Sequence, residues 1–535
     1  MLYLRKDETN LNDELQLKLL FTSDIHGNVL PLIYGTNEHA ELGLAKYATI
    51  VQQTRKKHEH VLVIDNGDLI QGTPLMAHYA KMHLSKANPM IEIMNQLQLD
   101  AFVPGNHEFN FGKDILLGAV NTSEFPWLSA NILTNNQSET YFGKPYLIKT
   151  LANDLKVAII GATTHYIPHW EAPEHIADFY FADAFDTLAT LVPHIKKTER
   201  PDILIVAYHG GFEKDLATGE ATGPLTGENQ GYKIASEIDG IDLLLTGHQH
   251  RILNDTIDNC LIIQPGSALK AYGDIELTVK KNQDDTWQLT HKKAEIKDLI
   301  DVPADGKVHT TIAPLEKSTQ AWLDQTIGHV VSDLTISDPM QVRLEKHPFI
   351  ELIQQIQMEA TGADISATAL LNNESTGFGK TVTMRDIAGN YIFPNTLVVL
   401  ELTGRDIKDA LELNASYFII NEKNGVTVNP AFTTPKPEHY NYDMWEGINY
   451  RFNLQKSFGE RVEAVSYHGK PLVDEATYHV ALNNYRASGG GNFTMFTNKP
   501  IVKEVQIDMV ELISAYIEAH SPVEVNVTKN FTITY

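Results

Sequence analysis

Short apolar runs alternate with helix-like segments through the first half of the chain, and this alternation limits the possible folds more than any other feature. We predict strands at residues 17–22, 61–65, 101–103, 157–161, 203–208, 243–246, 261–264 and 275–279. Helix-like stretches lie between them at residues 42–58, 90–97, 182–198 and 232–238. Strands that alternate with helices are typical of α/β domains. The first half is therefore predicted to be an α/β domain.

The second half has a different pattern and predicts a second domain. A chain of 535 residues is too long for a single hydrophobic core. We place the first domain at residues 1–300, a connecting helix at 301–327 and the second domain at 328–535. In the second domain we predict helices at 349–361, 404–414 and 508–519, and strands at 397–402 and 478–482.

Polar residues follow five of the predicted strands where each strand ends. In open α/β sheets, the carboxyl ends of the strands line the crevice that binds ligands, so these residues can converge on one place. In Asp-x-His and His-x-His, alternate side chains of an extended segment lie on the same side. The five motifs are Asp24-Ile25-His26-Gly27, Asn66-Gly67-Asp68, Gly105-Asn106-His107, His209-Gly210-Gly211 and Gly247-His248-Gln249-His250.

The residue types in these motifs predict a pair of metal ions. Carboxylate, imidazole and amide oxygen, without thiolate, suit Mn²⁺, Zn²⁺, Fe²⁺ or Co²⁺. The single cysteine, Cys260, excludes a disulfide framework and a cysteine-rich zinc site. One tetrahedral centre cannot use seven ligands, whereas two ions that share a bridging carboxylate can. The predicted ligands are Asp24, His26, Asp68, Asn106, His209, His248 and His250.

The charge of the chain indicates what such a site would bind. The formal net charge is −25, which disfavours attraction of long nucleic acids or anionic lipid. Two divalent ions carry four positive charges, of which Asp24 and Asp68 neutralise two and a bridging hydroxide one more. The local charge stays positive in an otherwise acidic protein, which predicts a phosphate site.

The sequence also bears on the compartment and on assembly. Residues 1–13 are charged and lack the apolar core of a signal peptide, and no later segment is long and apolar enough to span a bilayer. We therefore expect a cytoplasmic protein without membrane partners. The alternative is a chain whose leader has been removed. We expect a monomer or a homodimer.

The ordered motifs resemble those of the calcineurin-like metallophosphoesterases. Together with the second half, they are similar to the bacterial 5′-nucleotidase / 2′,3′-cyclic-nucleotide 2′-phosphodiesterase family over nearly the whole chain. The resemblance implies a four-layer α/β/β/α sandwich, a linker helix and an α+β C-terminal domain. Four stretches resemble the cyclic phosphodiesterase / 3′-nucleotidase branch in particular: Gly105–Asn110, Tyr166–Glu171, Phe393–Val399 and Asn483–Ala487.

The resemblance also implies roles for individual residues. Asp68 would bridge two divalent ions, most simply Mn²⁺, and a hydroxide between the ions would attack phosphorus in line with the leaving sugar oxygen. His107 would assist at the phosphate and the leaving group, with Asn110 orienting its ring. One ion would be held by Asp24, His26, Asp68 and His250, and the other by Asp68, Asn106, His209 and His248.

Two departures weaken the 5′-nucleotidase alternative. That branch has an aspartate three residues after the histidine, where this chain has Asn110, and an amide cannot stabilise imidazolium charge as a carboxylate does. It also has arginines in a glycine-rich stretch that grips the nucleotide. The matching residues here, 371–377, contain no arginine.

The second domain is expected to bind the base of a small nucleotide. Two aromatic rings can sandwich a base, which contributes about 1–3 kcal/mol per stacked base. Spacing to the family motif indicates Tyr442 and Phe493, with Tyr485 and Tyr440 as alternates. Asn483 and Arg486 could bind the base or the ribose.

The predicted activity is that of a 2′,3′-cyclic-nucleotide 2′-phosphodiesterase / 3′-nucleotidase. The alternatives are a 5′-nucleotidase, a UDP-sugar or dinucleotide pyrophosphatase and, more remotely, a non-catalytic nucleotide-binding protein. A nuclease is disfavoured by the acidic balance of the chain.

Overall fold

The computed structural model describes residues 14–82, 87–169, 171–221, 225–284, 286–393, 395–421, 425–434, 436–505 and 507–535. Trp170 and Pro394, which belong to two of the stretches quoted above, lie outside the described residues. The chain separates into two compact units, Met1–Ile33 with Glu38–Leu315 and Tyr34–Asn37 with Glu316–Tyr535. We call them the N-terminal and C-terminal units.

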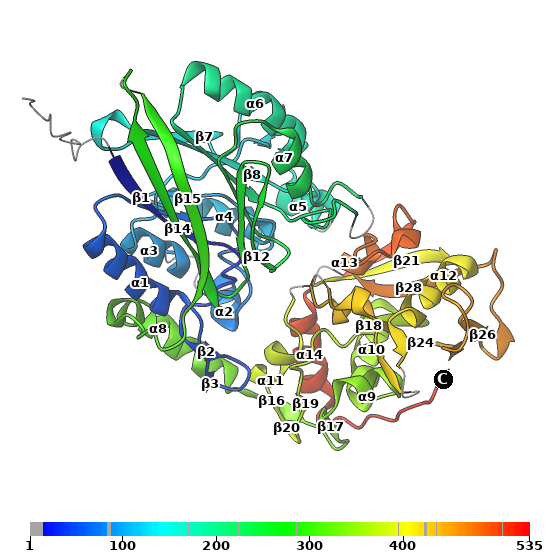
Figure 1. The fold of residues 1–535 in the computed structure, drawn as a ribbon. Helices are drawn as coiled ribbons and strands as arrows, with labels where there is room; N and C mark the ends of the chain where they lie inside the picture. The colour runs from blue at the N-terminus through cyan, green and yellow to red at the C-terminus, as the bar shows by residue number, and fades with distance from the viewer. Residues whose placement is uncertain are drawn as a thin grey trace, which may run out of the picture. The chain divides into compact units, whose positions relative to one another are not determined.

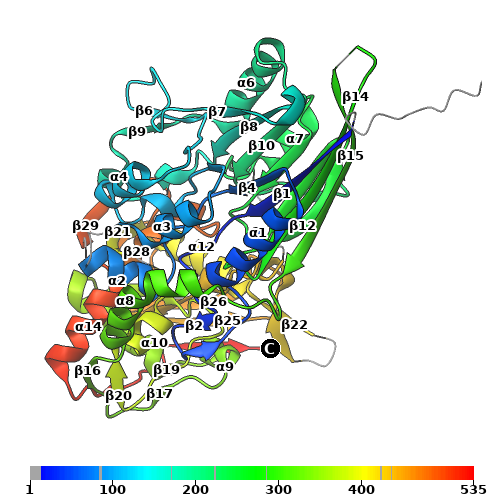
Figure 2. The ribbon, with the colours of Figure 1, turned by 90° about the vertical axis from the view of Figure 1, so that its left-hand side faces the viewer.

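Two β-sheets form the centre of the N-terminal unit. The first has the strand order β15-β14-β1-β4-β5 and the second the order β12-β13-β11-β10-β8-β7. β1, β4 and β5 are parallel to one another, as are β8, β10, β11 and β13. Figures 1 and 2 show β14 and β15 as long strands beside β1. The strands of the first sheet are β1 (Glu14–Thr22), β4 (Val61–Asp65), β5 (Ala101–Phe102), β14 (Ala271–Lys281) and β15 (Trp287–Asp298). Those of the second are β7 (Tyr146–Thr150), β8 (Lys156–Thr163), β10 (Ile203–His209), β11 (Leu243–Thr246), β12 (Ile252–Ile257) and β13 (Cys260–Pro265).

Alternation of side chains along the strands produces four layers. On β10, Ile203 and Ile205 belong to the apolar core between the two sheets, together with residues of β1, β4 and β14. Leu204 and Val206 face the other way and pack with residues of α6 (Ala184–Thr198) and α7 (Gly231–Glu237). Because successive strand residues point to opposite faces, one strand contributes to both cores. The predicted α/β/β/α sandwich is confirmed.

The other elements of the N-terminal unit are shorter connections and covering helices. α1 buries Tyr47, Ala48 and Val51, and α3 begins at Pro89, where the side chain of Asn88 accepts the backbone N–H groups of Met90 and Ile91. These elements are β2 (Leu32–Ile33), β3 (Glu38–His39), α1 (Leu44–Lys57), α2 (Pro74–Met82), α3 (Pro89–Gln96), α4 (Lys113–Thr122), β6 (Ile132–Thr134), α5 (Pro173–Ile176) and β9 (Phe179–Phe181).

The C-terminal unit is an α+β domain with its own core. Its main sheet has the order β24-β18-β28-β21-β29, and a second sheet has the order β27-β26-β25-β30. α10 (Pro348–Thr361), α12 (Gly404–Ala415) and α14 (Met509–His520) contribute buried residues to one apolar cluster with these strands. The strands are β18 (Ile365–Ala369), β21 (Leu397–Thr403), β24 (Asp443–Glu446), β25 (Ile448–Asn453), β26 (Val462–Tyr467), β27 (Lys470–Pro471), β28 (Thr477–Asn483), β29 (Ile501–Val505) and β30 (Phe531–Thr534).

Smaller elements complete this unit, and the long helix α8 (Gly306–Leu323) contains the point where the two units divide. Thr403 begins α12 with a capping box, in which its hydroxyl and the Asp406 carboxylate each bind a backbone N–H. The smaller elements are β16 (Thr326–His329), β17 (Leu334–Thr335), α9 (Pro339–Leu344), β19 (Gly377–Phe378), β20 (Thr381–Thr383), α11 (Met384–Asn390), β22 (Phe418–Ile420), β23 (Val426–Val428) and α13 (Asn484–Ala487).

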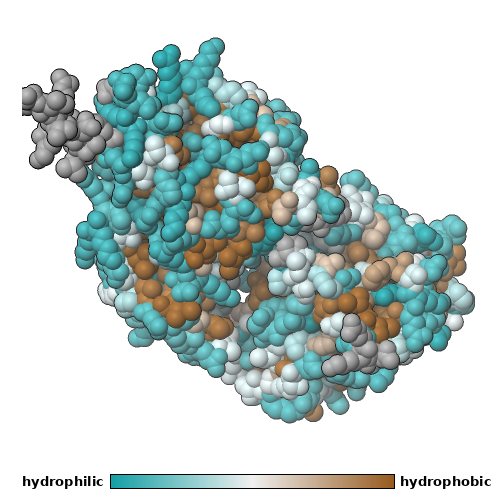
Figure 3. Space-filling model, in the orientation of Figure 1, coloured by the Kyte–Doolittle hydropathy of each residue, from teal (hydrophilic) through white to brown (hydrophobic). Residues whose placement is uncertain are grey.

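Hydrophilic side chains cover most of the face drawn in Figure 3, with hydrophobic groups between them. Among the described residues, no helix combines the length and the apolar character needed to span a bilayer.

Candidate metal centre

The strands that precede the predicted ligands end side by side. Thr22 of β1 lies in register with Asp65 of β4, and Asp65 in turn with Phe102 of β5. In the second sheet, Tyr208 of β10 lies in register with Thr246 of β11. The loops that leave these strands therefore start at the same edge of each sheet, as expected for parallel strands.

Three of the predicted ligands form a first group. The Nε2 atoms of His26 and His250 lie 3.0 Å apart, and His250 Nε2 lies 3.4 Å from Asp24 Oδ1. One ligand atom from each of the three residues lies within 4.8 Å of the others, close enough to hold one metal ion. Asp24 is fully buried, whereas both imidazoles are partly exposed.

Asp68, His209 and His248 form a second group of the same kind. His209 Nε2 lies 3.2 Å from Asp68 Oδ2 and 3.2 Å from the side-chain oxygen of Asn106. That oxygen also lies 2.8 Å from His248 Nδ1. Asn106 thus lies between the two imidazoles.

Asp68 connects the two groups. Its Oδ2 atom lies 3.2 Å from His209 Nε2 in the second group and 3.9 Å from His26 Nε2 in the first. The structure thus brings all seven predicted ligands into one cluster. A carboxylate between two sets of imidazoles has the geometry required to bridge two cations.

The backbone at the cluster adopts conformations that are rare for residues with side chains. Five of the seven predicted ligands have positive φ angles between 50° and 68°: Asp24, His26, Asp68, His248 and His250. Such conformations cost about 1–3 kcal/mol each and gather at functional sites. Gly105 permits close approach, because a Cβ atom there would lie 2.3 Å from Asp68 Oδ1.

The far side of three imidazoles is fixed by a hydrogen-bond partner. His209 Nδ1 lies 2.5 Å from the carbonyl oxygen of Asn66, and His26 Nδ1 lies 3.2 Å from that of Gln71. A carbonyl can only accept, so each Nδ1 carries a proton and Nε2 is the nitrogen that faces the cluster. His248 contacts Glu228 through Nε2, at 2.9 Å, and turns Nδ1 inward. Such partners set the tautomer and orientation of metal-binding histidines.

Glu108 holds two of the ligand-bearing loops together, a role that the sequence does not indicate. This fully buried carboxylate accepts the backbone N–H groups of Asp68 at 2.8 Å, Leu69 at 2.6 Å and Gly105 at 2.5 Å. Its only sequence signal is its position next to His107. A buried carboxylate with several donors is stable, and here it fixes the backbone on both sides of Asp68.

Burial and neighbouring charges shift the pKa values of three predicted ligands. Burial disfavours the charged form of Asp24, but the hydrogen bond and charge of His250 outweigh it and lower the pKa of Asp24 to about 2. Burial lowers the pKa of His26 to about 3. Burial opposes charge on His209 as well, yet the neighbouring Asp68 raises the pKa of His209 to about 10. Without metal, His209 and Asp68 therefore form a buried ion pair at neutral pH.

The two predicted catalytic residues lie beside the cluster. The ring of His107 lies 5.2 Å from that of His26, and its backbone N–H donates to Asp68 Oδ1 at 2.7 Å. Its Nδ1 atom lies 2.6 Å from the side-chain oxygen of Asn110. Both side chains are partly exposed.

The predicted aromatic sandwich of Tyr442 and Phe493 is wrong. Both side chains are fully buried and have no surface on which a base could stack. Tyr442 packs in the core of the C-terminal unit, 4.9 Å from the ring of Tyr417, and donates its hydroxyl to the carbonyl oxygen of Arg343. Phe493 stacks on Phe496.

The structure also contradicts the prediction that Arg486 and Asn483 contact the base or ribose. Arg486 is 1% exposed and its Nε donates to Asp443 at 2.6 Å, while a second nitrogen donates to the carbonyl oxygen of Tyr440. The side chain of Asn483 caps α13 by accepting the backbone N–H of Arg486. Both side chains therefore form hydrogen bonds within the C-terminal unit rather than facing a ligand.

The two alternates to the predicted aromatic pair, Tyr485 and Tyr440, are not buried. Both are partly exposed, and their rings lie 6.2 Å apart at an angle of 74°. The ring of Phe393 lies 5.9 Å from that of Tyr440.

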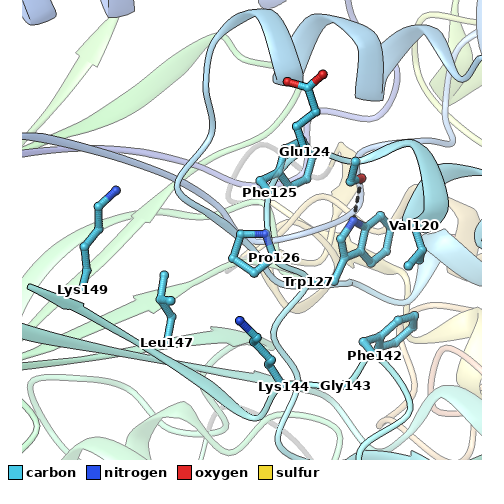
Figure 4. A pocket seen from close by; sticks show the side chains of 11 residues that line it. Val120, Glu124, Phe125, Pro126, Trp127, Phe142, Gly143, Lys144, Leu147 and Lys149 are labelled. Carbon is cyan, nitrogen blue, oxygen red and sulfur yellow. Dashed lines mark hydrogen bonds between the residues drawn. The ribbon is translucent and has the colours of Figure 1, made fainter.

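A separate cavity of about 630 Å³ lies elsewhere in the N-terminal unit (Figure 4). Trp127, Phe142 and Leu147 line it together with Lys144 and Lys149, and the Trp127 indole donates to Ser123. None of the predicted ligands lines this cavity.

Comparison with known proteins assigns each of the two units to a protein family. Residues 17–251 match the calcineurin-like phosphoesterase family, and residues 326–498 match the 5′-nucleotidase C-terminal domain. A structure described as "Putative 5′-Nucleotidase" from Staphylococcus aureus is 32% identical, with a TM-score of 0.89, and covers 97% of this chain and 100% of that one.

Curated relatives extend the comparison. The 2′,3′-cyclic-nucleotide 2′-phosphodiesterase/3′-nucleotidase of Haemophilus influenzae is 26% identical over 97% of this chain and 86% of its own length. The trifunctional nucleotide phosphoesterase YfkN of Bacillus subtilis is 27% identical over 98% of this chain, which spans only 39% of that longer protein. The chain therefore belongs to the 5′-nucleotidase family of calcineurin-like phosphoesterases.

Proposed function

We propose that this protein is a dimetal-dependent phosphoester hydrolase of nucleotides, with the activity of a 2′,3′-cyclic-nucleotide 2′-phosphodiesterase / 3′-nucleotidase. The convergence of two ligand groups on Asp68 is the observation that carries the proposal. Three curated relatives with this name, 25–27% identical to the chain, support the choice of substrate class.

The donor set fits two divalent cations. The Nε2 atoms of His26 and His209 face the cluster because their Nδ1 atoms donate to carbonyl groups, and Nε2 binds a cation once it carries no proton. Carboxylate, imidazole and amide donors suit Mn²⁺ first, with Zn²⁺, Fe²⁺ or Co²⁺ as alternatives. We assign Asp24, His26, Asp68 and His250 to one ion and Asp68, Asn106, His209 and His248 to the other.

Bound there, two divalent ions would lower the pKa of water and neutralise charge on the phosphoryl oxygens. The residues of the chain do the remaining work. His107, at the edge of the cluster, orients the phosphoester and passes a proton to the departing sugar oxygen. Asn110 holds the ring of His107 through Nδ1. Hydrolysis of the cyclic diester at the 2′ oxygen gives a 3′-monophosphate, and a second water then releases phosphate and the nucleoside.

For the base, we propose Tyr440 and Tyr485 in place of the buried pair. Both rings are partly exposed, and the Arg486 side chain supports them from within by binding the carbonyl oxygen of Tyr440. Stacking on aromatic rings tolerates any base, so selectivity would arise mainly at the phosphate.

A substrate panel tests the proposal. Metal-free protein, supplied with Mn²⁺, is assayed on 2′,3′-cyclic AMP, 3′-AMP, 5′-AMP and UDP-glucose, with a chelator as control. We expect the first two substrates to give the highest kcat/KM and the chelator to abolish turnover. A preference for 5′-AMP would favour a 5′-nucleotidase, the second candidate, which the name of the Staphylococcus aureus structure supports. Preferred cleavage of UDP-glucose would indicate a pyrophosphatase, and nucleotide binding without turnover would contradict catalysis.

A further inference from the structure

A chain of hydrogen bonds leads from His107 away from the metal cluster. Asn110 follows the short 3₁₀ turn His107–Phe109, and its side-chain oxygen lies 2.6 Å from His107 Nδ1. Its amide nitrogen donates to Glu171 Oε2 at 2.6 Å. Glu171 lies 61 residues further along the chain, in the loop after β8.

Asn110 by itself does not decide which nitrogen of His107 carries the proton. An amide has an acceptor end and a donor end of nearly the same shape and can turn either one toward the ring. With the oxygen toward the ring, Nδ1 keeps its proton, and Nε2 can take up a second proton and pass it to the leaving oxygen. With the nitrogen toward the ring, Nδ1 must accept and the proton moves to Nε2.

Glu171 removes this ambiguity, because a carboxylate can only accept. Its side chain is 6% exposed, and Oε1 already receives the backbone N–H of Ala172 at 2.9 Å and Nδ1 of His175 at 2.8 Å. The hydrogen bond to Glu171 raises the pKa of His175, which keeps a proton on that contact. The remaining oxygen must therefore receive the amide nitrogen of Asn110, which turns the amide oxygen toward His107.

We propose that Glu171 is a positioning residue that acts through Asn110 to fix the tautomer of His107. The protonated Nδ1 points to Asn110, and Nε2 is presented to the phosphoester. The inference deepens the proposed function and rests on it for the role of His107. The arrangement of hydrogen bonds itself does not depend on a bound metal.

Replacing Glu171 by glutamine should reverse the direction of the hydrogen bonds that run through Asn110 to His107. In E171Q the glutamine oxygen stays with Ala172 and His175, so its amide nitrogen faces Asn110. Asn110 must then turn its oxygen outward and its nitrogen toward His107. The proton of neutral His107 moves from Nδ1 to Nε2, and Nδ1, now an acceptor, cannot hold the second proton of the imidazolium that acts as the acid. The shape and packing of the side chain are nearly unchanged.

Exchanging the amide and the carboxylate between positions 110 and 171 should restore the original direction of the hydrogen bonds. In N110D/E171Q, the introduced aspartate accepts from His107 Nδ1 and from the amide nitrogen of the introduced glutamine, whose oxygen still accepts from Ala172 and His175. In E171D the shorter side chain is still an acceptor only, so the tautomer of His107 stays as in the wild type. E174Q is the matched control, because Glu174 is exposed on α5.

The test combines two measurements. Long-range ¹⁵N–¹H spectra of histidine-labelled, metal-free protein identify the protonated nitrogen of neutral His107, with H107A for assignment. Steady-state kinetics with Mn²⁺ and 3′-AMP give kcat and KM. We expect E171Q to invert the tautomer and to lower kcat by about 100-fold with little change in KM. We expect N110D/E171Q to recover the tautomer and most of kcat, and E171D and E174Q to keep the tautomer.

Either of two results would overturn the inference: an unchanged tautomer in E171Q, or an N110D/E171Q variant no better than E171Q in both measurements. Failure of the proposed function looks different. Wild-type protein that hydrolyses none of the four panel substrates would refute that proposal, while the spectra of the metal-free protein would still decide whether Glu171 sets the tautomer.

Discussion

Asp68→Asn tests the electrostatics at the centre of the cluster. The substitution keeps the size of the side chain and an oxygen for the backbone N–H of His107, but it removes the negative charge 3.2 Å from His209 Nε2. In metal-free protein this charge holds a proton on a fully buried imidazole, whose pKa is raised to about 10. Without it, burial favours neutral His209.

The size of the effect follows from linkage between protonation and folding. The folded pKa of His209 lies above the unfolded value of about 6.5, so the stabilisation is complete below about pH 6.5 and is lost as the pH rises toward 10. At pH 7 about three pH units separate the solution from the folded pKa, and each unit contributes about 1.4 kcal/mol. Asp68→Asn should therefore lower the free energy of unfolding by about 4 kcal/mol at pH 7, but by only about 1.4 kcal/mol at pH 9.

Urea unfolding of the metal-free full chain at pH 7 and pH 9 measures this difference. Asp239→Asn, at an exposed position, is the control and should be neutral at both pH values. A destabilisation by Asp68→Asn that is equal at the two pH values would refute the reasoning, because loss of packing or of a neutral hydrogen bond does not depend on the ionisation of His209.

Three further predictions concern the same site. His107→Ala should lower kcat by about two to four orders of magnitude while the bound metal, measured by elemental analysis, is unchanged; near-normal turnover would rule out the proposed role. Gly105→Ala places a Cβ atom 2.3 Å from Asp68 Oδ1 and 2.6 Å from His209 Cε1, so both metal content and kcat should fall. The control is Gly118→Ala, which has open space around its Cβ position and should change neither quantity. Mn²⁺ binding at pH 7 should release about one proton from His209, which calorimetry in buffers of different ionisation enthalpy detects, and no buffer dependence would contradict the ion pair with Asp68.

The strands and the ligand cluster could be predicted because their signals are local. The five predicted strands that precede the ligands are short runs buried almost throughout, and the polar residue that ends each one must lie at the edge of the sheet. β15 was not predicted because its exposed residues, such as Lys293 and Lys297, interrupt the apolar pattern, and its pairing with β14 is visible only in the fold.

The substrate residues could not be predicted in the same way. An aromatic or an arginine near a glycine-rich loop has the same sequence signal whether it faces a ligand or the core. Arg486 is buried because Asp443, 43 residues earlier, forms an ion pair with it, and this pairing is not encoded locally. Glu108, Glu171 and Glu228 were missed for the same reason, since each acts through a partner distant in sequence or through the backbone. The cytoplasmic location and the oligomeric state stay predictions from the sequence.

The central claim is that one carboxylate joins two cations. Anomalous diffraction at the manganese edge, from crystals of the protein loaded with Mn²⁺, tests it most directly. We predict two peaks about 3.5–4 Å apart, with Asp68 between them. A single peak, or peaks that Asp68 does not contact, would contradict it.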